Sequence, residues 1–143
     1  MVDLHLAKEI KEMYDNKKVS EKPDNIIKIY EFVKQLSSEN DELREELEDI
    51  NEFSAQIVIS DPDFKCWVKL GGGNFEYGKG EVDNPSYTLS CKQEIMGGMM
   101  QGDIDSTSAY MAGDLTIEGS LQDAMAYGEF LRTAVEISRD LEQ

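Results

Sequence analysis

The residue types that could carry out catalysis are few in this sequence and lie far apart. His5 is the only histidine, so a Ser-His-Asp set would require the N-terminal end to fold into a cleft. The glycines at 71–73 lie between two predicted strands, where no helix follows to receive a phosphate. The sequence contains no P-loop or dinucleotide fingerprint. We therefore expect no catalytic residues and a protein that is not an enzyme.

The residue types that bind metals are also arranged unfavourably. Asp103 and Asp105 have the spacing of a metal pair, but Asp103 can instead solvate the turn after Gly102. Cys66 and Cys91 fall on the apolar side of predicted strands, and two cysteines cannot form a zinc site by themselves. We expect these cysteines to be buried free thiols rather than a disulfide. The sequence predicts no metal site and no cofactor.

The charge of the chain excludes several classes of partner. The formal net charge is −16, and acidic residues outnumber basic ones in both halves of the sequence. Nucleic acids and anionic membrane surfaces attract Lys and Arg, so we expect neither to bind here. No apolar run approaches the roughly 20 residues that span a bilayer, and the first residues carry charges where a signal peptide is apolar. We expect a cytoplasmic protein without stable membrane insertion.

The N-terminal part has the pattern of two helices. Residues 3–14 have apolar side chains at helical spacing, and Pro23 separates them from a longer helix over residues 24–50. The longer helix has a heptad pattern that would suit a parallel homodimer with a polar seam residue. The same stripe could instead dock on the rest of its own chain. The predicted dimer interface consists of Ile26, Ile29, Val33, Leu36, Asn40, Leu43 and Leu47.

From residue 54 onward, an apolar period of two predicts strands. The predicted strands are 54–60, 64–70, 74–82, 86–92 and 113–119, and the first three form an antiparallel meander. A helix follows over about residues 121–141, with polar side chains on little more than a third of its circumference. Its surplus apolar face must meet a second surface, which could be the methionine-rich segment, a partner subunit or a bound apolar molecule.

The methionine-rich segment precedes the last strand. Residues 94–119, EIMGGMMQGDIDSTSAYMAGDLTIEG, hold four of the seven methionines and five glycines. Methionine adapts to irregular apolar space, and glycine within a helix lowers its stability by roughly 1 kcal/mol relative to alanine. This combination predicts a deformable apolar lining for a binding site. Methionines at helical spacing nevertheless occur more often in an ordinary core than around a ligand.

Residues 102–119 also carry a family pattern. Its elements are a glycine, an apolar-Asp pair, an Ala-aromatic pair, a glycine and alternating apolar residues ending in glycine: Gly102, Ile104-Asp105, Ala109-Tyr110, Gly113, Leu115, Ile117 and Gly119. In this pattern the chain resembles the sterol carrier protein type 2 family, over about residues 42–139. The resemblance implies an α+β fold with a five-stranded, mostly antiparallel sheet covered on one face by helices. It also implies an apolar tunnel between sheet and helices that binds fatty acyl chains or sterols.

The resemblance turns these patterns into a functional hypothesis. We expect residues 1–40 to be a helical extension, with a possible dimerisation helix continuing to 50, and residues 41–143 to be the lipid-binding domain. Such a domain binds and carries a fatty acid, acyl chain or sterol-like lipid without catalysis. The alternative is a dimeric interaction module that uses helix 24–50 and the apolar C-terminal helix. The expected ligand-binding residues are Leu89, Ile95, Met96, Met99, Met100, Ile104, Tyr110, Met111, Met125, Tyr127, Phe130 and Leu131.

Overall fold

A mixed sheet organises the molecule. The computed structural model describes residues 3–60 and 63–140, and this part contains a five-stranded sheet in the order β3-β2-β1-β4-β5. β1 pairs in parallel with β4, and the other three neighbouring pairs are antiparallel. The expected α+β class with a mostly antiparallel sheet is confirmed. The strands are β1 (Phe53–Ser60), β2 (Phe64–Gly71), β3 (Asn74–Lys79), β4 (Tyr87–Lys92) and β5 (Leu115–Gly119).

The period of two in the sequence places apolar side chains on one face of the sheet. Ile57, Val68 and Leu70 are fully buried there. The glycine turn predicted at 71–73 joins β2 to β3, and Gly71 has a φ of +117°. A Cβ on Gly71 would lie 2.5 Å from the backbone of Glu52, so this position requires glycine. The predicted turn at 61–63 lies largely outside the described residues.

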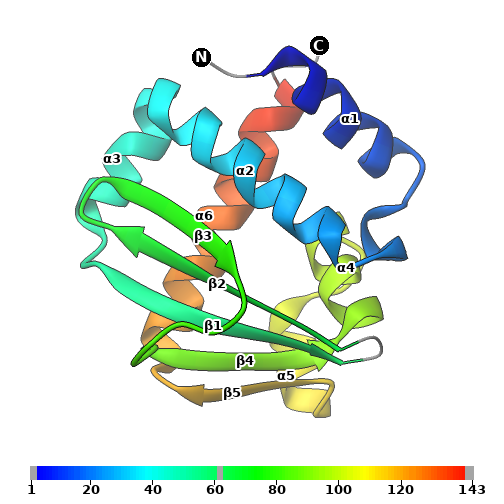
Figure 1. Ribbon diagram of the computed structural model, residues 1–143, viewed down its shortest axis with the longest axis vertical. Coiled ribbons are helices and arrows are strands. Elements are labelled where there is room, and N and C mark those ends of the chain that lie inside the picture. Colours follow the sequence, from blue (N-terminus) through cyan, green and yellow to red (C-terminus); the bar gives the residue numbers. More distant parts are fainter. Residues whose placement is uncertain (1–2, 61–62, 141–143) are drawn as a thin grey trace.

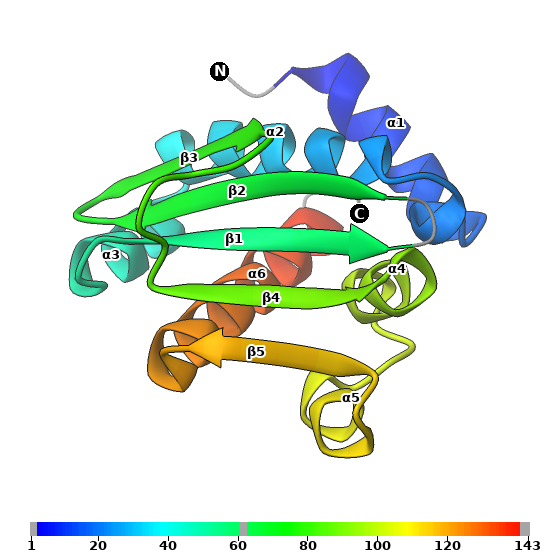
Figure 2. The ribbon, with the colours of Figure 1, turned by 60° about the horizontal axis from the view of Figure 1, so that its bottom comes forward.

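Helices cover the inner face of the sheet, where α2, α3 and α6 form a layer (Figures 1 and 2). A loop crosses the opposite face between β3 and β4, and Gln56 holds it through hydrogen bonds with the carbonyl of Gly80 and the N–H of Val82. None of the described helices is long and apolar enough to cross a bilayer. The helices are α1 (Leu4–Asp15), the 3₁₀ turn η1 (Val19–Glu21), α2 (Asp24–Glu39), α3 (Asp41–Asp49), α4 (Gln93–Gln101), α5 (Ser106–Ala112) and α6 (Leu121–Asp140).

The predicted heptad helix over 24–50 is wrong, because the chain breaks at Asn40. Asn40 has extended backbone angles, φ −93° and ψ 120°, and its side-chain oxygen accepts a hydrogen bond of 3.0 Å from the N–H of Leu43. It is therefore the N-cap of α3 and not a polar seam residue. The apolar residues of the predicted seam are occupied inside the same chain, at 0–3% exposure: Ile26, Ile29, Val33, Leu36, Leu43 and Leu47. They leave no exposed stripe for a coiled-coil partner.

The hydrophobic core extends into the first helices. Ile10, Met13 and Val19 are buried and belong to the same core cluster as Ile57 on β1 and Phe130 on α6. The 3₁₀ turn η1 lies against α4 on the side away from β5 (Figure 1). The N-terminal segment thus packs on the elements that follow it. A domain boundary at residue 40 stays a prediction.

Candidate functional site

The inner face of the sheet is covered unevenly. Over β1 and β2, core side chains such as Ile57 and Val68 are completely buried. The part of the inner face at β4 and β5 is bordered differently. There α4 and α5 lie at one end of the two strands, and α6 begins at the opposite end (Figure 2). Apolar side chains in this second region pack on the core but remain half-buried: Ile95, Met99, Met100, Ile104, Ile117 and Leu131. We call this set the half-buried apolar cluster.

The structure divides the predicted ligand-binding residues into three groups. Four are buried in the core, namely Leu89, Met96, Tyr127 and Phe130. Five belong to the half-buried apolar cluster, namely Ile95, Met99, Met100, Ile104 and Leu131. Three are exposed, at 41% for Tyr110, 81% for Met111 and 66% for Met125. The first two groups therefore join one continuous apolar region, and the exposed three project away from it.

Three tyrosines, one each from α2, β4 and α6, lie inside the core. The hydroxyls of Tyr30 and Tyr127 are 2.5 Å apart and hydrogen-bonded, and the rings of Tyr87 and Tyr127 lie 6.5 Å apart. Burial raises the pKa of each phenol above its usual value, so these side chains stay neutral. The Tyr87 hydroxyl is buried and has no hydrogen-bond partner within the described part of the chain. Sequence reasoning singled out Tyr127 and missed Tyr30 and Tyr87, because their contact joins distant segments.

Two glycines of the methionine-rich segment, Gly98 and Gly102, have identifiable packing and backbone roles. A Cβ on Gly98 would lie 2.3 Å from Cδ1 of Ile104, so this glycine allows Ile104 to pack tightly on the helix. Gly102 ends α4 in the left-handed conformation, and the N–H groups of Asp103 and Ile104 bond back to the carbonyl of Gly98. Asp105 caps α5 through a 3.0 Å bond from the N–H of Ser108. The segment is therefore a closely packed corner.

The two cysteines are buried free thiols, as the sequence predicted. Burial raises the pKa of Cys66 to about 12. Burial also raises the pKa of Cys91 to about 11, although a hydrogen bond from the N–H of Met96 lowers it slightly. Among the described residues, no three His, Cys, Asp or Glu side chains are grouped so that they could hold a metal ion. Neither thiol is suited to nucleophilic chemistry near neutral pH.

Gln93 is the residue that sequence reasoning missed entirely. The buried positions of β4 are Tyr87, Leu89 and Cys91, and Gln93 continues this alternation into the first turn of α4 at 3% exposure. Its amide nitrogen and oxygen both lack a hydrogen-bond partner among residues 3–60 and 63–140. The period of two continues to residue 93 in the sequence. A glutamine at the start of a helix nevertheless looks like an ordinary surface residue.

A polar surface pocket of about 390 Å³ lies where β1 and β4 begin. Its lining includes Phe53, Lys69 and Asp123, and Ser86 donates a hydrogen bond to Asp123. None of the predicted ligand-binding residues lines it. Its charged rim gives it the character of a hydrated surface depression.

Comparisons with known proteins agree with this architecture. Sterol carrier protein 2 from Yarrowia lipolytica, in its apo form, has a TM-score of 0.63 at 16% identity, covering 77% of this chain and 89% of that one. Palmitated SCP2L2 from Aedes aegypti has a TM-score of 0.53 at 17% identity, covering 72% and 90%.

Two further comparisons are less informative about this chain. The sec-alkylsulfatase Pisa1 from Pseudomonas sp. matches at a TM-score of 0.49 and 16% identity, covering 56% of this chain. This chain spans only 12% of the sulfatase's length. A sequence comparison with curated proteins returns no match.

The model of the SCP-2 sterol transfer family matches residues 33–132, most of the sequence. The chain therefore belongs to the SCP-2 sterol transfer family.

Proposed function

We propose that this protein binds and carries a single-chain amphipathic lipid, without catalysis, between β4 and β5 of the sheet and the helices α4 and α6. Membership of the SCP-2 sterol transfer family supports lipid binding or transfer in general. The observation that carries the location is the half-buried apolar cluster on this side of the sheet. A fatty acyl chain placed there would cover apolar surface that the protein itself leaves partly in contact with water.

The hydrophobic effect supplies enough affinity for such a carrier. Removing apolar surface from water contributes about 25 cal/mol per Å², so a few hundred Å² give on the order of 5 to 10 kcal/mol before ordering costs. This range includes micromolar dissociation constants. One similar protein, SCP2L2 from Aedes aegypti, is described as palmitated, and a fatty acyl ligand is accordingly the class to test first.

Two neighbouring residues on β5 provide the test of this site. Ile117 is half-buried on the inner face, and Thr116 is exposed on the outer face of the same strand. We expect Ile117→Trp to fill the proposed site and weaken displacement of a fluorescent fatty-acid analogue by palmitate at least 10-fold. Thr116→Trp should leave this displacement unchanged, because its side chain points away from the helices.

Native mass spectrometry of the purified wild-type protein supplies the second measurement. A co-purifying lipid, together with saturable displacement, supports the proposal. A folded wild-type protein that neither retains a lipid nor binds the fluorescent analogue would overturn it. Equal loss of binding in both tryptophan variants would overturn the location.

A further inference from the structure

Gln93 is the amide of α4 in which neither the nitrogen nor the oxygen has a partner among the described residues. It lies at the first position of α4 with 3% of its surface exposed, and neither Nε2 nor Oε1 has a hydrogen-bond partner in the described chain. In Gln101, at the other end of α4, only Oε1 lacks a described partner, because Nε2 donates to the carbonyl of Tyr14 at 2.8 Å. Burying an amide without partners costs free energy, whereas a surface position would cost nothing. An internal amide of this kind is expected where it has a polar partner to bind.

The position of Gln93 connects it to the proposed lipid site. The row of buried residues along β4 begins at Tyr87, passes Leu89 and Cys91 and ends at Gln93. At about 3.3 Å per residue, the row is roughly 20 Å long. Its middle is apolar, and its two ends carry the buried amide of Gln93 and the unpartnered hydroxyl of Tyr87. This arrangement suits a chain-like molecule with a polar end.

The backbone around Gln93 adds further donors. Lys92 is the N-cap of α4 and, within the described structure, makes no capping hydrogen bond with its side chain. The N–H groups of the first turn of α4 have no acceptor within the helix. An oxygen atom placed beside Gln93 therefore finds donors from both the amide and the helix.

We propose that Gln93 recognises the head group of the bound lipid, and that this head group is neutral and carries both a hydrogen-bond donor and an acceptor. A carboxamide, a hydroxyl or an un-ionised carboxylic acid meets this requirement, because it can pair with Oε1 and Nε2 together. An ionised carboxylate can only accept hydrogen bonds, from Nε2 and from the helix N–H groups, so it leaves Oε1 unpaired and must lose its hydration. This inference rests on the proposed lipid-binding function and specifies its ligand.

The first experiment compares two matched substitutions on α4. Gln93→Met keeps the volume of the side chain and removes an unpaired amide, so the urea midpoint of the ligand-free protein should rise. Gln101→Met makes the same change at an amide that has a partner, so the midpoint should fall. A fall in the midpoint for Gln93→Met would overturn the inference, since it would show that the amide already has partners in the folded protein.

The second experiment measures head-group preference by displacement of a fluorescent fatty-acid analogue. The competitors are lauramide, dodecanol, dodecyl methyl ether and laurate, which share one chain and differ in the head. For lauramide and dodecanol, Gln93→Met should weaken binding about 10-fold, as expected for the loss of charge-neutral hydrogen bonds in a buried site. Dodecyl methyl ether, and laurate measured at about pH 9 where it is ionised, can only accept a hydrogen bond, so for them the ratio of wild-type to variant constants should change clearly less. Each ratio compares the same competitor in two proteins, so differences in water solubility between the competitors cancel.

The outcomes separate this inference from the proposed function. If the wild type binds all four competitors and Gln93→Met changes none of them, the head-group assignment is overturned while lipid carriage stands. A selective loss of ionised laurate, measured at about pH 9, in Gln93→Met would overturn the neutral head group. If the wild type binds none of the competitors, the lipid-carrier function fails and the inference fails with it. Gln101→Met serves as the control and should preserve the wild-type order of preference.

Discussion

At the scale of single residues, polar groups in the interior distinguish this protein. Tyr30 and Tyr127 satisfy each other's hydroxyls, whereas the hydroxyl of Tyr87 and the amide of Gln93 have no partners in the part of the chain that the structure describes. Buried polar groups are normally paired, so a ligand that forms hydrogen bonds with these two would lower the free energy of the folded protein. Cys66 and Cys91 are also interior groups, but a neutral thiol behaves as a small apolar side chain.

The thiols give a prediction about pH. The pKa of Cys66 is about 12 and that of Cys91 about 11, because both are buried. A thiol in an unfolded chain ionises at about 8.5. Because the folded pKa values are higher, the thiols favour the folded state below the unfolded value, and this stability is lost as pH rises through the folded values. We expect no reaction with Ellman's reagent between about pH 7 and 9 in the native protein, and rapid reaction in urea.

An exposed cysteine serves as the control for this measurement. Ser106 lies at the exposed start of α5, so Ser106→Cys should react in the folded protein, and faster as pH approaches 8.5. Rapid labelling of Cys66 or Cys91 under native conditions would show that the interior opens to solvent, contrary to their exposed fractions of 0% and 7%.

At the scale of elements, the break between α2 and α3 determines how the N-terminal half folds. The extended Asn40 turns the chain between α2 and α3, and Leu36 and Leu43 on either side of it are both buried in the core. Asparagine suits this position because its side chain accepts a hydrogen bond from the N–H of Leu43. The heptad spacing thus arises from two short amphipathic helices that share one core.

Asn40→Leu separates the two interpretations. A leucine at a coiled-coil seam position would raise dimer stability, whereas the loss of an N-cap should lower the free energy of unfolding by about 1 kcal/mol. We expect the second result in urea unfolding followed by circular dichroism. Asn40→Asp retains the accepting oxygen and should remain close to the wild type. A stabilised Asn40→Leu protein with a larger sedimentation coefficient would instead support the seam.

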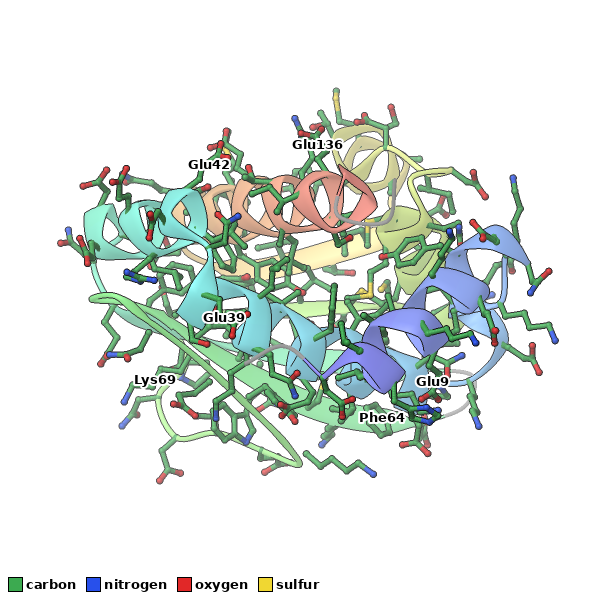
Figure 3. All side chains as sticks on the ribbon, turned by 90° about the horizontal axis from the view of Figure 1, so that it is seen from above. Glu9, Glu39, Glu42, Phe64, Lys69 and Glu136 are labelled. Carbon is green, nitrogen blue, oxygen red and sulfur yellow. The ribbon has the colours of Figure 1, made fainter. Side chains whose placement is uncertain are left out.

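At the scale of the whole molecule, the net charge of −16 works against compactness. Acidic side chains project from several helices, as Glu39, Glu42 and Glu136 do on the helical layer in Figure 3. Ion pairs such as Lys34–Glu76 and Lys79–Asp24 link α2 to β3, but they lie at the surface and contribute little stability. Repulsion among the excess carboxylates therefore outweighs attraction within these pairs.

Salt should stabilise the protein for this reason. Raising NaCl from about 0.01 M to about 0.15 M shortens the screening length from roughly 30 Å to 8 Å, which weakens repulsion between distant carboxylates. We expect a higher urea midpoint at the higher salt concentration. Choline chloride at equal ionic strength should act equally, since the effect depends on screening and not on a bound cation. An unchanged or lower midpoint would show that the surface ion pairs dominate.

Local patterns in the sequence were sufficient to predict most of the fold. The alternation in Ile57, Val68 and Leu89 predicted strands with one buried face, and the pattern over residues 102–119 led to the family that the comparisons show. Glycine turns and the cap at Asp105 also depend on neighbouring residues alone. Such features are set by backbone sterics and short-range hydrogen bonds, so they can be predicted without knowing the tertiary contacts.

The candidate site depends on contacts between distant segments, and there prediction was incomplete. Helical spacing assigned Met111 and Met125 to the ligand wall, but both are exposed, because spacing describes one helix and not what packs against it. The sequence by itself determined the strands, the turns and the acidic surface. Only the tertiary structure decided that Asn40 caps a helix and that Tyr30 meets Tyr127. It also decided that Gln93 is buried without a partner, since burial is a property of the surrounding elements and not of the residue.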